Sequence, residues 1–417
     1  MFCSKSVISA AVSLMCLAAS AAVHAQTPQA QHQLIAGPTT VAFGHYDPNK
    51  PGVLTVQSGD VVEVTTMLTS SPRGLARMGL PAAEVQPELI AIYEQVTDRG
   101  PGGHILTGPI HVEGAEPGDV LEVRILSIDY DIDYGYNGCS GFVPSLCDQD
   151  RRSRLIRIDR ERGQAEIAPG VVVPLNPFFG SMGVAPPPDS GRVSSNPPGR
   201  HAGNMDNKEL VAGTTLFIPV WVAGALFQVG DGHAAQGDGE VNQTGLETSL
   251  RGKLQLTVLK GQTLDWPRAE TPTHHILMGF DPDLEVATEI AIRETVEFLQ
   301  ERLGLTSGEA YAVVSMAVDL RVTELVDGNV GVHAMVAKSL LRLALTPRSG
   351  APQVFQSKFP PGTLGRAPRP QIGSVAPLVD RPIGRRPLRS SIRTCRADDN
   401  RVAGHMDQRR FRRGPSA

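Results

Sequence analysis

The chain has 417 residues, of which 41% are hydrophobic and 20% charged, and this is typical of a globular protein with one large or two medium domains. Its 43 glycines and 33 prolines against 5% aromatic residues favour many turns and short strands over long helices. Beyond the first residues no apolar run approaches the roughly 20 residues that cross a bilayer, so we expect no membrane span. The net charge of −4 points to no particular partner, and we expect no nucleic acid to bind.

The first 25 residues have the pattern of a secretory signal peptide. Lys5 precedes an apolar run, and Val23-His24-Ala25 offers a small-residue cleavage site before Gln26. A buried N-terminal helix is the alternative. We therefore expect a secreted or periplasmic protein. In such an oxidising compartment the neighbouring Cys139 and Cys147 are expected to form a disulfide, and two unpaired surface thiols are the alternative.

A β-rich region is predicted over residues 26–262. The sequence VLTVQSGDVVEVTTM alternates around a Ser-Gly-Asp turn, which predicts two strands of a half-buried sheet. Its core GDVVEV at Gly59–Val64 recurs as GDVLEV at Gly118–Val123, and this either marks two similar β units or is a chance repeat. A helix is expected around Ala82–Thr97, and three short strands over Arg151–Pro174.

The stretch NPFFGSMGVAPPPDSGRVSSNPPGR has no period, so we expect a long loop that either lines a pocket or is a mobile connector. KLQLTVLKG then predicts a strand. An α+β part is predicted over residues 263–346. It consists of a helix ended by Gly304, a second helix over Ser307–Ala317 with Thr306 and Glu309 as its capping box, and a hairpin around Asp327-Gly328 that contains a structural His333.

The predicted fold class is thus mainly β with an α+β portion, made of two β-sandwich- or barrel-like units plus a smaller region with two helices and a hairpin. Residues 26–262 carry the site, and residues 263–346 belong to the same catalytic unit. Residues 347–417 form a basic tail rich in Pro and Arg that we expect to be disordered. This tail either binds an anionic surface or is an extension without function.

Most candidate chemistry falls in Arg200–Thr248, where loops dense in Gly, Asp and His follow strands. In DGHAAQGDGE, Asp231 and His233 are two residues apart, so they project to the same face of an extended segment. Asp206 comes from the preceding loop, and the segment between is expected to fold as a hairpin that returns the chain beside it. Asp206, Asp231 and His233 are therefore the candidate ligands of a divalent ion, with zinc the first choice.

An ion with an open coordination position activates water and polarises a carbonyl group. Glu240 is the candidate base that takes the water proton and returns it to a leaving amine, and Asp206 is a second candidate catalytic carboxylate. His104 is either a ligand or proton carrier or a structural histidine. The candidate substrate contacts are Asn204, Gln236 and His201, and for His201 the alternative is a turn cap.

Several long phrases, NPFFGSMGVAP, PPGRHAGNMDNKEL and GTTLFIPVWVAGALFQVGDGHAAQGDGEVNQTGLE among them, resemble the acetamidase/formamidase family, and the resemblance covers roughly residues 33–340. It implies hydrolysis of short linear amides to ammonia and a carboxylate, a mostly β architecture, a homo-oligomer, and a divalent metal near Asp206 and Asp231–Glu240. The alternatives are an amidase for another small amide or carbamoyl compound and a secreted β-rich binding protein with a structural ion. The export signal departs from a family that is mainly cytoplasmic.

Overall fold

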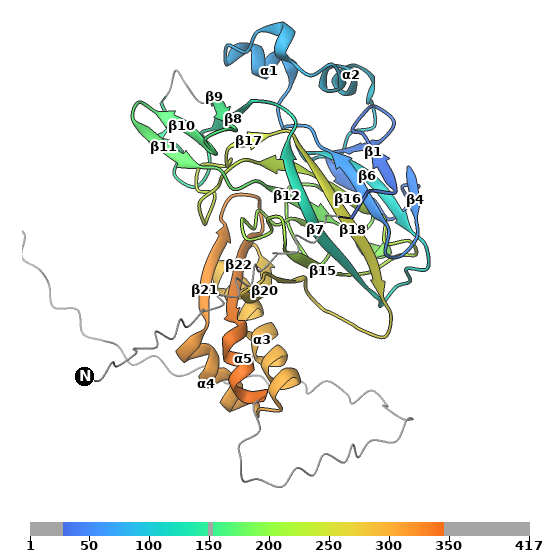
Figure 1. Ribbon diagram of the computed structural model, residues 1–417, viewed down its shortest axis with the longest axis vertical. Helices are drawn as coiled ribbons and strands as arrows, with labels where there is room; N and C mark the ends of the chain where they lie inside the picture. Colours follow the sequence, from blue (N-terminus) through green and yellow to red (C-terminus); the bar gives the residue numbers. More distant parts are fainter. Residues whose placement is uncertain (1–27, 149–152, 346–417) are drawn as a thin grey trace, which may run out of the picture. The chain divides into compact units, whose positions relative to one another are not determined.

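The computed structural model describes residues 28–148 and 153–345 (Figure 1). The predicted signal peptide, residues 1–25, and the predicted tail, residues 347–417, lie outside the described residues. Within the described part of the chain, no helix is both long and apolar enough to cross a membrane.

Two large sheets contain most of the strands. The nine-stranded sheet has the spatial order β1 (His32–Leu34), β5 (Val61–Thr65), β18 (Leu250–Leu259), β7 (Val120–Tyr130), β15 (Thr215–Pro219), β19 (Arg268–Glu270), β20 (His274–Asp281), β22 (Val330–Ala337) and β21 (Asp319–Glu324). The second sheet has eleven strands. Its main path is β11 (Val171–Pro174), β10 (Gln164–Ala168), β9 (Ser153–Asp159), β8 (Tyr134–Gly138), β17 (Glu247–Thr248), β16 (Phe227–His233), β12 (Phe178–Gly183) and β14 (Ala202–Asn204). Off this path, β6 (Ile105–Val112) pairs with β16, and β2 (Val41–Phe43) and β4 (Leu54–Val56) pair with β6. A separate pair joins β3 (His45–Tyr46) to β13 (Val193–Ser194).

The two large sheets pack on one continuous apolar core. Leu121 and Leu254 enter it from the nine-stranded sheet, and Phe179 and Phe227 enter it from the other. All four side chains are fully buried, and each contributes about 1.5–3 kcal/mol relative to an exposed position. In the first part of β18, buried residues alternate with more exposed ones, so one face of this strand packs on the core.

Helices cover two separate parts of this framework. α1 (Pro72–Arg77) and α2 (Pro87–Gln95), with the 3₁₀ turn η1 (Ala82–Glu84) between them, bury Leu75 and Leu89 in a cluster with Phe43 and Ile105. α3 (Leu284–Leu303) and α4 (Ser307–Ala317) pack with Leu277 and Val336 of β20 and β22. In Figure 1 they lie together with α5 (Lys338–Leu345) beside these strands. Two further 3₁₀ turns are η2 (Pro144–Leu146) and η3 (Pro188–Ser190).

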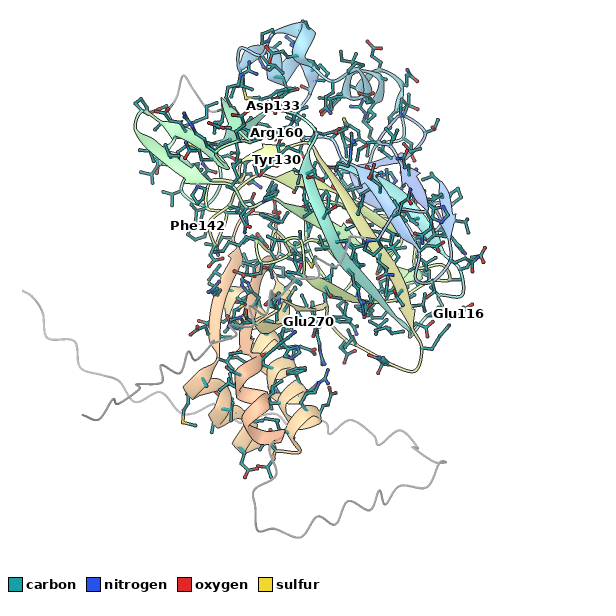
Figure 2. The ribbon with its side chains drawn as sticks, viewed as in Figure 1. Glu116, Tyr130, Asp133, Phe142, Arg160 and Glu270 are labelled. Carbon is teal, nitrogen blue, oxygen red and sulfur yellow. A yellow bond between two sulfur atoms is a disulfide. The ribbon has the colours of Figure 1, made fainter. Side chains whose placement is uncertain are left out.

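The predicted fold class, mainly β with an α+β portion, is confirmed. α3 ends at Gly304 with a left-handed φ of 67°, α4 begins with the Thr306–Glu309 capping box, and β21 and β22 pair as the predicted hairpin. The three predicted strands of Arg151–Pro174 are β9, β10 and β11. Arg160, at the turn after β9, donates to the Tyr130 carbonyl and pairs with Asp133, which ties this meander to the end of β7 (Figure 2). The division at residue 262 stays a prediction.

The GDVVEV repeat corresponds to a structural repeat. Asp60 Oδ2 accepts from the Gln57 backbone N–H at 2.9 Å, and Asp119 Oδ2 accepts from the Glu116 N–H at 2.8 Å. In both copies the preceding glycine has a left-handed φ, and the turn carries the chain from the eleven-stranded sheet into the nine-stranded sheet. The expectation of two strands in one sheet was wrong, because β4 and β5 belong to different sheets.

Three other expectations were also wrong. FFGSMG, Phe178–Gly183, is not part of a loop but forms β12, whose six residues are all buried, so the strand shows no alternation of apolar and polar residues. The segment between Asp206 and Asp231 is not a hairpin, since β15 and β16 lie in different sheets. The helix expected around Ala82–Thr97 is split, because Pro87 begins α2 and lacks the N–H that would continue η1.

Candidate active site

Four carboxylates surround one imidazole at the end of β16. From His233 Nε2, the nearest carboxylate oxygen of Glu247 is 3.2 Å away, that of Asp231 3.3 Å, that of Asp206 3.8 Å and that of Glu240 4.0 Å. All five side chains are buried. The expectation that Asp206, Asp231, His233 and Glu240 gather in one place is therefore met in the geometry, and Glu247 joins them.

Strand pairing, and not a hairpin, brings Asp206 to Asp231. β14 pairs with β12 and β12 pairs with β16, so Asp206, two residues after β14, lies beside Asp231 on β16. Gly180 on β12 leaves the space that the two acids need. A Cβ atom at Gly180 would lie 2.4 Å from Asp206 Oδ1 and 2.7 Å from Asp231 Oδ2.

Three of the clustered acids have left-handed backbone conformations. The φ angles are 48° at Asp206, 55° at Asp231 and 42° at Glu240. Residues other than glycine adopt this region at a cost of order 1 kcal/mol or more, and it persists where the surrounding structure imposes it, often at functional sites. The local backbone is thus shaped to turn these carboxylates toward His233.

Hydrogen bonds fix the orientation of the imidazole. Gln236 Nε2 donates to the Asp206 carbonyl and its Oε1 accepts from His233 Nδ1, both at 2.7 Å. Because Nδ1 carries the proton of this bond, Nε2 is left facing the carboxylates. Asn204 Nδ2 donates to Asp206 Oδ2 at 2.7 Å, and the Thr69 hydroxyl donates to Asp231 Oδ1 at 2.8 Å.

The pKa values of the clustered carboxyl groups are shifted in different directions: three are raised and one is lowered. Burial raises the pKa of Asp206 and of Glu240 well above the usual range of a carboxyl group, and the nearby carboxylates raise both further. Burial also raises the pKa of Glu247, to about 7. At Asp231 burial acts in the same direction, but the imidazoles of His104 and His233 outweigh it and lower the pKa below its usual range. Carboxyl groups with different affinities for a proton therefore share one site.

A cavity of about 190 Å³ opens onto these carboxylates. His104 lines it, with Nε2 3.8 Å from Asp231 Oδ2 and Nδ1 bonded to the Ser195 carbonyl at 3.1 Å. Asn196, which follows Ser195 in the long segment after β12, also lines the cavity. This part of the segment therefore lines a pocket, which was one of the two expectations for it.

The three residues predicted to contact the substrate lie in different places. Asn204 lines the cavity. Gln236 supports His233 and Asp206 from outside it. His201 stands apart, buried against Tyr46 with 5.0 Å between ring centroids, and burial lowers its pKa to about 4. The roles assigned to these residues stay predictions.

Two acids of the site were missed from the sequence. Glu247 follows the Gly-rich loop on β17, and no motif distinguishes it from a surface strand residue. Asp327 sits in the Asp-Gly turn of the β21–β22 hairpin, where Asp is common for local reasons. Its Oδ2 accepts from Asn204 at 2.9 Å and its Oδ1 from Gln243 at 2.9 Å, so the hairpin tip reaches the cavity.

The residues present fit a divalent metal ion. Two groups have ligand atoms that all lie within 4.8 Å of one another, namely Asp206, His233 and Glu240, and Asp231, His233 and Glu247. Neither is the predicted set of Asp206, Asp231 and His233. Within the described residues, Asp206 Oδ1 and Glu247 Oε1 are buried without a hydrogen-bond partner. Buried carboxylates this close repel one another unless protons or a cation compensate them, and these groups have the ligand types to hold a cation.

Comparison with known proteins gives a consistent result. The model of the Acetamidase/Formamidase family matches residues 100–192 and 190–339. The chain is 24% identical over 337 residues to the formamidase of Methylophilus methylotrophus, covering 62% of this chain and 81% of the relative. It is 29% identical over 203 residues to the acetamidase of Mycolicibacterium smegmatis, covering 34% of this chain and 50% of the relative.

Solved structures are similar over most of their length. The crystal structure of a recombinant predicted acetamidase/formamidase from Thermoanaerobacter tengcongensis superposes with a TM-score of 0.64 and 27% identity, covering 75% of this chain and 97% of that one. An acetamidase from Bacillus halodurans gives a TM-score of 0.64 and 28% identity, covering 75% of this chain and 99% of that one.

Proposed function

Since the chain belongs to the acetamidase/formamidase family and is therefore an amidase for linear amides, we propose that formamide and acetamide are its substrates and that a divalent metal ion assists their hydrolysis. Zinc is our first choice of ion. The observation that carries the proposal is the buried group of four carboxylates around His233 Nε2, which opens onto a small cavity.

The cavity size supports small substrates. Pockets for drug-sized ligands have volumes of about 300–1,000 Å³, whereas this cavity has a volume of about 190 Å³. Its walls offer acceptors in the carboxylates and in Asn204 Oδ1, which has no partner among the described residues, and a protonated carboxyl group or a protonated His104 can act as donor. A carboxamide group needs both kinds of partner, one for its carbonyl oxygen and one for its N–H groups.

The ligands we propose come from both groups of donors, with His233 common to them and Asp206 and Asp231 as the first oxygen ligands. When bound, the ion supplies Lewis acidity, which polarises an amide carbonyl and makes water more acidic. Glu240 is the group that takes up the water proton and delivers it to the leaving nitrogen. Burial raises the pKa of Glu240, and a raised pKa favours its delivery of a proton to the leaving nitrogen.

His104 is placed to assist on the other side of Asp231. Its Nδ1 is occupied by the Ser195 carbonyl, so its Nε2 faces the cavity. In this orientation the neutral ring can accept from a substrate N–H at Nε2, and the doubly protonated ring can donate from Nε2 to Asp231 or to the substrate carbonyl oxygen. Burial of His233 and of the four carboxyl groups around it strengthens the interactions among them.

We also propose that the protein is exported and works as a homo-oligomer. The signal-like sequence of residues 1–25 supports export. The disulfide between Cys139 and Cys147 fits an oxidising compartment, where such bonds persist. Determination of the mature N-terminus from a periplasmic or culture fraction tests export, and sedimentation equilibrium tests the subunit number.

The decisive experiment measures ammonia release from formamide and acetamide before and after chelation, together with the metal content of the purified protein. We expect turnover of at least one amide that is lost on chelation and restored by zinc. Turnover that survives complete metal removal would contradict metal assistance. Activity on neither amide but on a carbamoyl compound would move the substrate class. Loss of folding on chelation without any turnover would favour the binding-protein alternative.

A further inference from the structure

We propose that Asn137 and the disulfide-closed loop Cys139–Cys147 position the neighbouring segment Val241–Gly245, so that efficient amide turnover requires the disulfide. This inference rests on the proposed function, since it concerns the same cavity. It assigns a role to a part of the chain that holds none of the reacting groups.

The segment Val241–Gly245 belongs to a long connection without strand structure. β16 ends at His233 and β17 begins at Glu247, and the residues between them include Glu240. Gln243 and Thr244 of this connection line the cavity, and Gln243 has a left-handed φ of 85°. Its position therefore depends on contacts with other parts of the chain and not on sheet pairing of its own.

One side of the connection is held by the β21–β22 hairpin. The Gly239 N–H donates to the Thr323 carbonyl at 3.0 Å, and the Leu325 N–H donates to the Gly239 carbonyl at 3.1 Å. Gln243 Nε2 donates to Asp327 Oδ1 at 2.9 Å. These bonds secure the part that precedes Glu240 and the side chain of Gln243.

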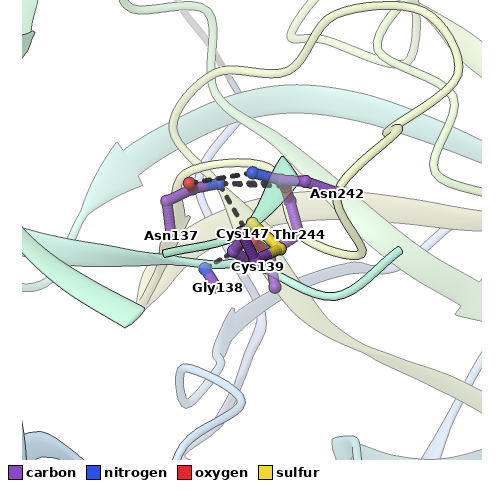
Figure 3. Close-up of a disulfide and its surroundings, with 6 residues drawn as sticks. All are labelled: Asn137, Gly138, Cys139, Cys147, Asn242 and Thr244. Atoms are coloured by element: carbon purple, nitrogen blue, oxygen red, sulfur yellow. Dashed lines mark hydrogen bonds between the residues drawn. A yellow bond between two sulfur atoms is a disulfide. The ribbon is translucent and has the colours of Figure 1, made fainter. Parts of the chain in front are cut away.

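The other side is held by Asn137, at the end of β8 (Figure 3). Its Nδ2 lies 3.1 Å from the Thr244 carbonyl, 3.0 Å from Thr244 Oγ1 and 2.9 Å from the Gly245 carbonyl. Its Oδ1 accepts from Asn242 Nδ2 at 3.1 Å. One side chain thus contacts three residues of the segment, Asn242, Thr244 and Gly245.

The disulfide-closed loop continues this contact with its backbone. The Gly138 N–H donates to Thr244 Oγ1 at 2.7 Å, the Ser140 N–H to the Asn242 carbonyl at 3.1 Å, and the Phe142 N–H to the Val241 carbonyl at 2.8 Å. The approach is close, since a Cβ atom at Gly141 would lie 2.3 Å from the Val241 oxygen. The loop and the segment are therefore packed backbone to backbone.

The disulfide is what keeps this loop in shape. Its large apolar side chains do not form a core, because Phe142 is 63% exposed (Figure 2) and Leu146 is 81% exposed. The bond joins Cys139 to Cys147, with 5.7 Å between their Cα atoms. Opening the bond frees a segment whose burial does not compensate for the entropy of ordering it, so the contacts with Val241–Gly245 weaken.

The test uses the chain from Gln26 onward with Cys395→Ser, so that Cys139 and Cys147 are its two remaining cysteines. We expect reduction to lower kcat for acetamide or formamide by about 10- to 100-fold, because small displacements of catalytic groups have effects of this size. KM changes less than kcat, and re-oxidation restores the rate. A Cys139→Ser/Cys147→Ser variant gives the same loss. Equal kcat values for oxidised and reduced protein would overturn the proposal.

Asn137→Ala provides a second, independent approach to the same segment. If Asn137 and the disulfide act through Val241–Gly245, their effects are not additive, and reduction of the Asn137→Ala variant costs little further activity. Fully multiplicative losses would contradict a shared route. Thr306→Ala is the control for general destabilisation, because it removes the capping box of α4 outside the cavity. It lowers the unfolding temperature without changing kcat.

Hydrogen exchange separates this proposal from the proposed function. On reduction, backbone exchange should rise across Val241–Gly245 while that of β16 stays unchanged. If the protein hydrolyses neither amide, the proposed function fails, and exchange alone decides whether the loop holds the segment. Unchanged exchange in Val241–Gly245 after complete reduction would refute the positioning role.

Discussion

β16 and the connection Gly237–Gly245 contribute to the same site in different ways. All seven residues of β16 are buried, and the strand pairs with β12, β6 and β17, so Asp231 and His233 are fixed by the sheet itself. The connection has no strand and relies on the hairpin tip at one side and on Asn137 at the other. We call β16 the strand side of the site and Gly237–Gly245 the loop side. We expect changes on the strand side to abolish the site and changes on the loop side to lower the rate of turnover.

The largest effect is expected at the centre of the strand side. We expect His233→Ala to abolish both metal binding and amide turnover, because it removes the one donor common to both ligand groups and leaves buried carboxylates without their cation. Metal analysis and the ammonia assay measure the two losses. His32→Ala, which removes a half-buried imidazole paired with Asp60, is the matched control and should leave both unchanged. Retention of the metal by the His233 variant would exclude His233 as a ligand.

The next largest effect concerns the loop side. We expect Glu240→Gln to retain the metal but lower kcat by about 10²- to 10⁴-fold, since an amide cannot carry the proton between water and the leaving nitrogen. Kinetics at saturating amide, with metal content determined on the same sample, measures this. A near-normal rate would remove Glu240 as the base, and loss of the metal would make it a ligand instead.

A smaller effect is expected at Gln236, which links the two sides. Gln236→Ala should weaken metal affinity or activity by about 10- to 100-fold, because it frees His233 Nδ1 and the Asp206 carbonyl from their shared partner. Titration with a competing chelator gives the affinity. Gln255→Ala on β18 removes a comparable bond to the Gly59 carbonyl, and it should have no such effect. Equal affinities for both variants would show that the imidazole needs no help in orientation.

The smallest effect is expected at His333 in the β21–β22 hairpin, and it concerns the stability of the protein and not its catalysis. Burial lowers the pKa of His333 from 6.5 to about 4, so the folded protein keeps this imidazole neutral. As the pH falls below 6.5, the unfolded chain takes up a proton that the folded state does not, so stability present above pH 6.5 is lost between pH 6.5 and 4.

The titration of His333 lowers the free energy of unfolding between pH 7 and pH 5. We therefore expect His333→Gln to make this decrease smaller, by about 2 kcal/mol at most. Urea unfolding at both pH values measures it. His333 Nδ1 shares a 2.8 Å hydrogen bond with the Thr323 hydroxyl, which Gln can replace. Parallel pH profiles for the two proteins would mean that His333 does not titrate in this range.

What the sequence could predict depended on how local the signal was. The capping box at Thr306, the helix end at Gly304 and the Asp327-Gly328 turn each arise from residues within a few positions, and all were predicted correctly. The disulfide between Cys139 and Cys147 closes a short loop and was also predicted. β12 was missed because a strand buried on both faces does not alternate, and its glycine serves the acids of the site.

The gathering of Asp206, Asp231 and His233 was expected for a partly wrong reason. Residues two positions apart in one extended segment do converge, as Asp231 and His233 show, but Asp206 arrives through the β14–β12–β16 pairing and not through a hairpin. Asp327 could not be found from the sequence, because its place in the cavity depends on how the β21–β22 hairpin meets Gln243, 84 positions earlier, a relation that no local pattern contains. Contacts between residues far apart in the sequence were therefore the part of the site, and of the sheets, that the sequence could not predict.

The position of β18 has a consequence for the order in which this protein folds. The strand lies between β5 and β7, so residues near 60 and 125 of the nine-stranded sheet meet only after Leu250–Leu259 has been inserted between them. Contacts over such sequence separations form slowly. The nascent chain thus stays without its central sheet until most of it has been synthesised, and an export pathway that threads unfolded polypeptide would receive it in that state.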